Sequence, residues 1–199
     1  MVNECWSCEP TPAAAYIERV AAEARKVDLT EVEALVAAIA HRYETGRTVF
    51  IIGNGGSGAN ASHLCEDLGK GTLTDFDFQK RLKVISLTDN TPYILAWGND
   101  TDFSRIFTEQ LKNLAAPDDL LIAISGSGNS PNILHAIEYA KAHEIMTFGI
   151  TGFEGGRLRQ IADACLHVPC ADMGIAEAVH GIFFHYLVDA LRERFAFDR

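Results

Sequence analysis

The stretch that decides the fold is residues 49–58, which read Val-Phe-Ile-Ile-Gly-Asn-Gly-Gly-Ser-Gly. Four apolar residues predict a buried strand, and the glycine-rich segment after them predicts a tight turn into a helix. A second stretch of this kind is residues 120–130, Leu-Leu-Ile-Ala-Ile-Ser-Gly-Ser-Gly-Asn-Ser. Glycines, serine hydroxyls and the first N–H groups of a helix together can hold an anion. Each loop alone also fits an ordinary strand-to-helix connection, but the pair favours a phosphate ligand.

Neither loop matches a nucleotide motif. No Lys-Ser or Lys-Thr pair follows the glycines as it does in a Walker P-loop. The third glycine of the dinucleotide fingerprint is also missing from both loops. The sequence therefore predicts no nucleotide cofactor.

Composition narrows the class of protein. The chain has 199 residues, of which 48% are hydrophobic and 22% charged, and this predicts one globular domain over residues 1–199. A net charge of −10 with no basic run argues against nucleic-acid partners and anionic membranes. Five scattered cysteines and no export-like N-terminus predict reduced thiols and a cytoplasmic location. Residues 1–12 read as a flexible tail, and the lone Cys5-x-x-Cys8 pair in it is given no role.

Apolar runs alternate with helical patterns from residue 48 onward. The predicted strands are 49–52, 82–87, 120–124, 146–150 and 165–168. The predicted helices lie near 57–70, 91–98, 102–114, 130–143, 155–162 and 175–195. Apolar runs without polar alternation indicate strands covered on both faces. We therefore expect a three-layer α/β/α sandwich around a doubly wound, five-stranded parallel sheet of flavodoxin-like type, with ligands beyond the carboxyl ends of its strands.

Two further helices are expected ahead of the first strand, within residues 13–46. The segment from Glu33 to Ala40 has few polar residues. Its helix must lie either deep in the domain or against another subunit. We favour contacts between subunits for this region.

Two helical segments combine histidines with carboxylates. His63 and Asp67 are one turn apart on the helix that the first glycine loop opens. On the last helix, Glu177 lies between His180 and His185 on the helical wheel. Such sets suit a Zn²⁺ site or an acid–base pair, although spacing alone fits a solvated or core pair more often.

Polar residues also follow the second strand and the helix after it. Asp89 closes that strand, and Asn99 and Asp100 follow the stretch that contains Trp97. They could bind hydroxyl groups of a polyol. The alternative is a turn and a helix cap, with Asp102 capping a helix that begins at Phe103.

Taken in order, these motifs resemble the sugar isomerase (SIS) domain of phosphoheptose isomerases from about residue 30 onward. The matching segments are Gly-Asn-Gly-Gly-Ser at 53–57, His63-x-x-x-Asp67, Asn99-Asp100, residues 124–130, Thr151-Gly152 with Gly155-Gly156, and Glu177-x-x-His180-x-x-x-x-His185. The resemblance implies a homotetramer with active sites at subunit interfaces. It also implies conversion of sedoheptulose 7-phosphate to D-glycero-D-manno-heptose 7-phosphate for surface-polysaccharide synthesis.

The resemblance also assigns roles to residues. Asp67 and His185 would transfer protons, and one zinc ion per subunit would be bound by His63, Asp67, Glu177 and His185. This assignment selects His185 over His180. With the polar residues above, the predicted substrate-binding set is Asn54, Gly55, Gly56, Ser57, Asp89, Asn99, Asp100, Ser125, Gly126, Ser127, Ser130 and Glu177.

The chain departs from the family pattern at four positions. Asp67 replaces Glu and Glu177 replaces Gln, and both changes favour a bound divalent cation. Gly126 replaces Thr in the phosphate loop and Gly174 replaces Asp, which leaves another sugar phosphate open as the substrate.

Two other functions are alternatives. A non-catalytic SIS module, resembling the DnaA initiator-associating protein, would lack the carboxylate at position 67 and carry Asn at position 185. Both residues are kept here, which favours an enzyme. A sugar-phosphate-binding regulator would usually carry a DNA-binding segment, and residues 1–30 contain none.

Overall fold

The structure, a computed structural model, describes residues 12–196. Cys5 and Cys8, with the rest of residues 1–11, lie outside this range, so the predicted tail stays a prediction.

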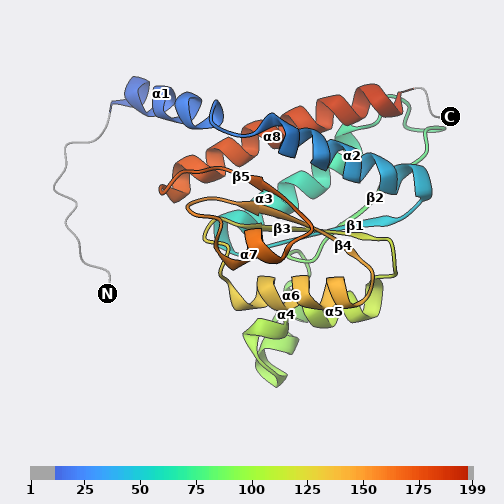
Figure 1. The fold of residues 1–199 in the computed structure, drawn as a ribbon. Coiled ribbons are helices and arrows are strands. Elements are labelled where there is room, and N and C mark those ends of the chain that lie inside the picture. Colours follow the sequence, from blue (N-terminus) through green and yellow to red (C-terminus); the bar gives the residue numbers. More distant parts are fainter. Residues whose placement is uncertain (1–11, 197–199) are drawn as a thin grey trace.

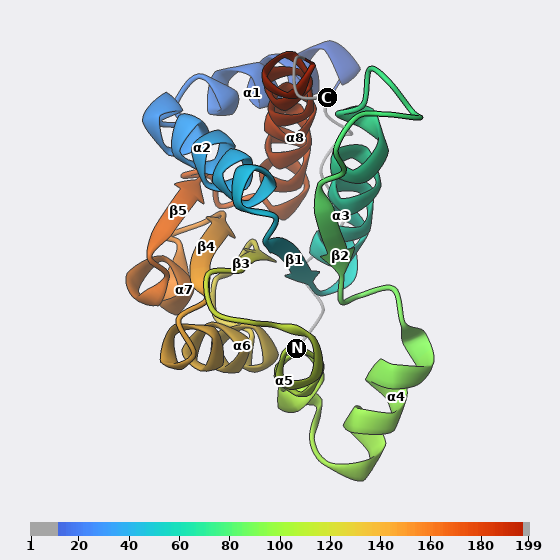
Figure 2. The same ribbon diagram turned by 90° about the vertical axis from the view of Figure 1, so that its right-hand side faces the viewer.

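Five parallel strands form one sheet (Figure 1), and Figure 2 shows them in the order β2-β1-β3-β4-β5. Their bounds are β1 (Thr48–Gly53), β2 (Lys83–Ser86), β3 (Leu120–Ser125), β4 (Met146–Thr151) and β5 (Ala164–His167). The predicted doubly wound sheet is therefore confirmed. The chain passes from β1 to β2 at one edge of the sheet and then returns to β3 on the other side of β1. The direction in which strands are added therefore reverses between β1 and β3, which is the topological switch point of the sheet.

Helices account for most of the remaining described chain. They are α1 (Ala13–Ala24), α2 (Leu29–Thr45), α3 (Gly55–Glu66), the π-helical η1 (Asp67–Gly71), α4 (Thr91–Asp100), the 3₁₀ turn η2 (Phe103–Arg105), α5 (Thr108–Leu114), α6 (Pro131–Ala142), α7 (Gly156–Ile161) and α8 (Met173–Phe195). The single helix predicted at 102–114 was wrong. Ile106 and Phe107, each 1% exposed, turn into the core there and separate η2 from α5. No helix between residues 12 and 196 is long and apolar enough to cross a bilayer.

Helices cover both faces of the sheet (Figures 1 and 2), and one apolar layer lies between the sheet and the helices on each face. Val49 and Ile51 of β1 pack with α2, α3 and α8, whereas Phe50 and Ile52 pack with α5, α6 and α7. All four side chains are at most 1% exposed. This two-sided burial explains why the strands read as uninterrupted apolar runs.

The N-terminal helices behave differently from each other. The apolar residues of α2, including Val32, Leu35 and Ile39, are buried in the core of their own chain. The apolar segment at 33–40 therefore needs no second subunit to cover it. Helix α1 has no buried residue and packs along α8, so subunit contacts remain a prediction for α1.

Replacing Ile122 at the centre of the sheet tests this layering. Ile122 is fully buried, so Ile122→Ala should lower the free energy of unfolding by about 2–5 kcal/mol, through lost apolar contact and a residual cavity. Leu114→Ala, at a 49% exposed site, should change it by less than about 0.5 kcal/mol. Urea unfolding followed by circular dichroism measures both, and equal effects of the two variants would contradict the assignment.

Candidate active site

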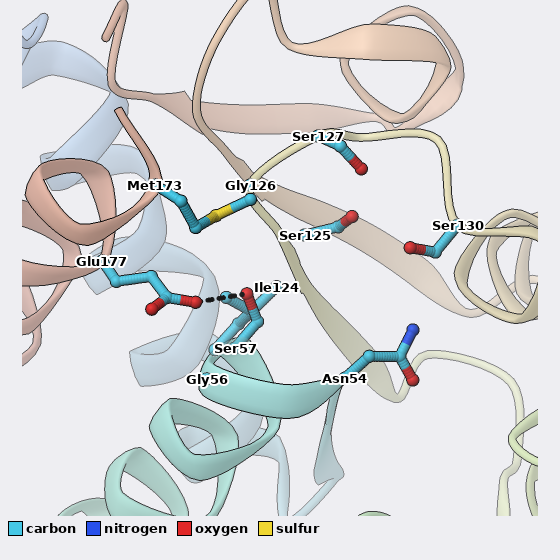
Figure 3. A pocket seen from close by; sticks show the side chains of 10 residues that line it. All are labelled: Asn54, Gly56, Ser57, Ile124, Ser125, Gly126, Ser127, Ser130, Met173 and Glu177. Carbon is cyan, nitrogen blue, oxygen red and sulfur yellow. Dashed lines mark hydrogen bonds between the residues drawn. The ribbon is translucent and has the colours of Figure 1, made fainter. Parts of the chain in front are cut away.

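The two glycine loops meet at one pocket. Because β1 and β3 are neighbours in the sheet, with Gly53 paired to Ile124, the loops that follow them lie side by side. The pocket between them has a volume of about 230 Å³ (Figure 3). Its lining is Asn54, Gly56, Ser57, Ile124, Ser125, Gly126, Ser127, Ser130, Met173 and Glu177. The structure thus brings together eight of the twelve residues predicted to bind substrate.

The second loop is fixed by the loop that follows β4 and by the helix α7 that this loop leads into. Gly152 N–H donates to the Gly126 carbonyl at 2.9 Å, and Leu158 N–H donates to the Gly128 carbonyl at 2.9 Å. Gly128 has φ +65°, and a side chain there would overlap the backbone of Gly155. The serine hydroxyls are therefore presented from a backbone with little freedom to move.

One wall of the pocket comes from the start of α8. Met173 and Glu177 are one helical turn apart, and both point toward the loops in Figure 3. Ser57 Oγ donates to Glu177 Oε1 at 3.4 Å, and Met173 Sδ fills the space that a side chain at Gly126 would need. The predicted helix began at 175, so Met173 was missed. Its spacing of four residues from Glu177 is the signal that could have found it.

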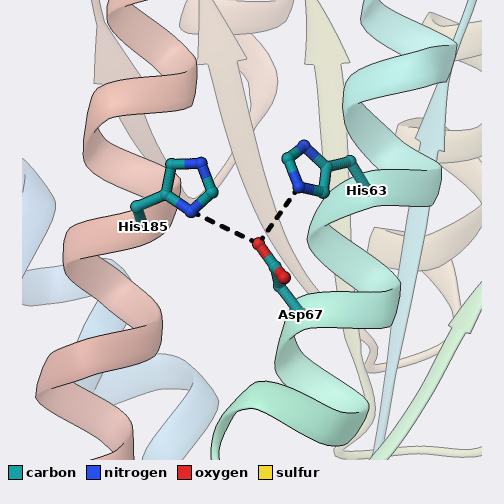
Figure 4. Close-up of side chains that lie close together, drawn as sticks. All are labelled: His63, Asp67 and His185. Atoms are coloured by element: carbon teal, nitrogen blue, oxygen red, sulfur yellow. Dashed lines mark ion pairs between the residues drawn. The ribbon is translucent and has the colours of Figure 1, made fainter.

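Helix α3, its continuation η1 and helix α8 also bring His63, Asp67 and His185 together (Figure 4). Asp67 Oδ2 lies 3.4 Å from His63 Nε2 and 3.4 Å from His185 Nδ1. One ligand atom from each residue lies within 4.8 Å of the other two. The histidine side chains are 57% and 63% exposed and that of Asp67 is 22% exposed, so a small molecule can reach the cluster. Two imidazole nitrogens and a carboxylate oxygen can share a proton or a metal ion.

The helix changes its winding at this cluster. Asp67 is the first residue of η1, where α3 continues as a π-helical segment. Such segments widen a helix locally and frequently occur at functional sites. The sequence pattern at 57–70 predicted helix but gave no sign of this change.

Glu177 and His180 lie outside the cluster. The Glu177 carboxylate lies against Gly56 in the pocket. His180 is fully buried, and its Nε2 donates to the Thr151 carbonyl at 3.1 Å. Burial lowers the pKa of His180 to about 4, so its ring is neutral at pH 7. Its role is structural, as a hydrogen-bonded side chain in the core. Of the two histidines on α8, the structure thus places His185 in the cluster.

The other four predicted substrate-binding residues do not line this pocket. Gly55 lines a neighbouring cavity of about 330 Å³ on the far side of Asn54. Asp89 accepts a hydrogen bond from Ser62. Asn99 Nδ2 donates to Asp100 Oδ1 at 2.8 Å at the end of α4, a helix with no buried residue that extends away from the sheet in Figure 2.

The alternative interpretation of Asp102 is confirmed. It is the N-cap of η2, and its carboxylate accepts a hydrogen bond from Ser104 N–H at 2.8 Å. It therefore has a local structural role at the end of α4.

The comparisons with known proteins agree with this geometry. A family described as SIS domain matches residues 14–152. The phosphoheptose isomerase of Geotalea daltonii is 35% identical over 170 residues, which cover 85% of this chain and 86% of that protein. The structure of a phosphoheptose isomerase from Francisella tularensis has a TM-score of 0.83 and 30% identity, covering 90% of this chain and 96% of that one.

A second solved structure, the phosphoheptose isomerase of Neisseria gonorrhoeae, has a TM-score of 0.82 and 26% identity, with 91% of this chain and 96% of that one covered. The family match at residues 14–152 contains strands β1 to β4, both glycine loops, and His63 and Asp67. The chain therefore belongs to the phosphoheptose isomerase family of SIS-domain enzymes.

Proposed function

We propose that this enzyme converts sedoheptulose 7-phosphate to D-glycero-D-manno-heptose 7-phosphate. The observation that carries the proposal is that one pair of helices, α3 and α8, borders both the serine-lined pocket and the cluster of His63, Asp67 and His185. The pocket suits a phosphate, and the cluster suits proton transfer at the other end of the same molecule. The names of the relatives support the choice of a seven-carbon sugar.

The spacing of the two sites supports a substrate of this length. Ser57 and His63 are six residues apart on α3, which is about 9 Å along the axis. Glu177 and His185 are eight residues apart on α8, which is about 12 Å. Carbon–carbon bonds of about 1.5 Å give an extended chain from C1 to a phosphate on C7 a length of roughly 10 Å. The sugar would therefore reach from the pocket to the cluster.

The reaction moves a proton between two neighbouring carbons through an enediol. From the ketose, a base removes a proton from C1 while O2 gains one, and O1 then loses a proton as C2 gains one. Asp67 and His185 would share these transfers, because Asp67 Oδ2 and His185 Nδ1 are 3.4 Å apart. The loops would hold the phosphate, and this remote binding aligns C1 and C2 with the cluster.

The cluster also fits the zinc ion that the family resemblance implies. His63, Asp67 and His185 offer two nitrogens and one oxygen, a donor set that zinc accepts. The fourth predicted ligand, Glu177, is on the same helix as His185 but faces the pocket. A divalent cation bound there would polarise the oxygens on C1 and C2.

We also propose a homotetramer with sites at subunit interfaces. Helices α1 and α4 have no buried residue, and exposed apolar side chains lie on or beside them, among them Ile17 at 63%, Leu95 at 65% and Phe103 at 58%. Contact between copies would cover them. Asn99 and Asp100 on α4 would then approach the site of a neighbouring subunit.

A charged sugar phosphate does not cross a bilayer, so the enzyme would work where its substrate is made, which we propose is the cytoplasm.

The assignment of the proton-transfer pair predicts the effect of two substitutions. Asp67→Asn and His185→Ala should each lower kcat for sedoheptulose 7-phosphate at least about 100-fold, because each removes a group that moves protons. His143→Ala, which changes an exposed histidine bonded to the Tyr139 carbonyl, should leave kcat unchanged. Chromatographic detection of the aldose measures turnover. Full activity in either site variant would overturn the mechanism, and a wild-type enzyme inactive on this sugar would indicate another sugar phosphate or a binding module.

The donor set predicts metal content. Purified enzyme should contain about one zinc ion per chain, and His63→Ala should lose it because one of the three nitrogen or oxygen donors is gone. Inductively coupled plasma mass spectrometry measures the ratio, with His143→Ala as the matched control. Metal-free wild-type enzyme that still turns over would remove zinc from the proposal and leave the Asp67 and His185 pair.

The exposed helices predict the assembly state. Light scattering after size-exclusion chromatography should give four times the mass of one chain. Replacing both Ile17 and Leu95 with glutamate should reduce that mass, since charges at a buried contact are costly. A monomeric wild-type enzyme with full activity would contradict the interface.

A further inference from the structure

Asn54 and Asn132 form a reciprocal pair of hydrogen bonds across the sheet's switch point. Asn54 Nδ2 donates to Asn132 Oδ1 at 2.9 Å, and Asn132 Nδ2 donates to Asn54 Oδ1 at 2.9 Å. Asn54 is in the first glycine loop and is the N-cap of α3, and Asn132 is in the first turn of α6, after the second loop. Asn132 is 2% exposed and is not among the residues that line the pocket. The pair therefore joins the two loops behind the pocket.

A hydrogen bond from the backbone fixes which end of each side-chain amide is the oxygen and which is the nitrogen. Ile133 N–H donates to Asn132 Oδ1 at 3.0 Å, so this end of the Asn132 amide must be the oxygen. That oxygen accepts from Asn54, which requires the amide nitrogen of Asn54 to face it. The Ile133 N–H group thus fixes the orientation of the Asn132 amide, which in turn fixes the orientation of the Asn54 amide.

Asn54 keeps hydrogen-bonding capacity for a ligand. Its amide has two N–H groups and two lone pairs on oxygen, and the pair with Asn132 uses one of each. Among residues 12–196, its side chain has no other protein partner in the structure, and it lines the pocket. The remaining N–H and lone pair are available to substrate oxygens.

We propose that Asn132 is a positioning residue of this enzyme: it sets the orientation of the Asn54 amide and holds the two phosphate loops in register. This inference rests on the proposed function, in which a sugar phosphate occupies the pocket. Asn132 itself would touch no substrate atom. Without it, Asn54 would present donor and acceptor in either order, and the loops would lose their direct side-chain link.

A double-mutant cycle separates this role from a general effect on stability. Asn54→Ala and Asn132→Leu should each lower kcat/KM about tenfold, the size of one neutral hydrogen bond. The double variant should also be lowered only about tenfold, because Asn132 acts through Asn54. Asn113→Leu, the same substitution at an exposed position of α5 whose side chain donates to Tyr93 Oη, should match wild type. The dissociation constant of inorganic phosphate, measured by calorimetry, should follow the same pattern.

Asn132→Asp gives a second test that keeps the side-chain volume. Its carboxylate still accepts from Ile133 and Asn54, but places a second oxygen opposite Asn54 Oδ1. The loss in kcat/KM should be at least as large as in Asn132→Leu. This variant therefore still tests the positioning role if Asn132→Leu fails to fold.

The outcomes are distinct. A double variant lowered about 100-fold, or an Asn132→Asp variant as active as wild type, would overturn the positioning role. A wild-type enzyme that binds inorganic phosphate but converts no heptose phosphate would refute the proposed function alone, and the phosphate cycle would still test Asn132.

Discussion

The adjacency of β1 and β3 is the constraint on which the site depends. In a parallel sheet all carboxyl ends lie at one edge, and the order β2-β1-β3-β4-β5 makes the chain leave β1 and β3 toward opposite faces. The two glycine loops are therefore neighbours although about 70 residues separate them in sequence. The pocket, the amide pair behind it and the helices that begin beside it all follow from this arrangement.

The site combines a rigid part, the glycine loops, with a more exposed part, the His63, Asp67 and His185 cluster. The second glycine loop is held by backbone hydrogen bonds from the segment after β4, and both loops contain glycines in close contact with neighbouring backbone. The His63, Asp67 and His185 side chains instead extend from helix surfaces and are partly exposed. If the proposed function holds, a phosphate group would meet a site that is already formed, whereas the side chains proposed for proton transfer would be ordered further by substrate or a cation.

Much of the fold could be predicted because its signals are local. The apolar runs at 49–52 and 120–124 need only burial on two faces to become central strands. The break between η2 and α5 could not be predicted, since Ile106 and Phe107 fit a helical pattern and only the tertiary core draws them inward. The histidine and carboxylate spacing gave His63 and Asp67, but the partner from α8 depended on how that helix packs. Family resemblance chose His185, and the buried position of His180 gives the physical reason.

Gly126 and Met173 bear on how this pocket can change in evolution. A side chain at 126 would need the space that the end of the Met173 side chain occupies, so a residue larger than glycine at 126 requires the Met173 side chain to move or to be replaced. At position 128 the backbone of Gly155 leaves no room for a side chain, so the loop keeps this backbone path only with glycine there. A larger residue at 126 would therefore change the pocket together with the position of the side chain at 173, whereas a shorter residue at 173 would enlarge the pocket without any change in the loop.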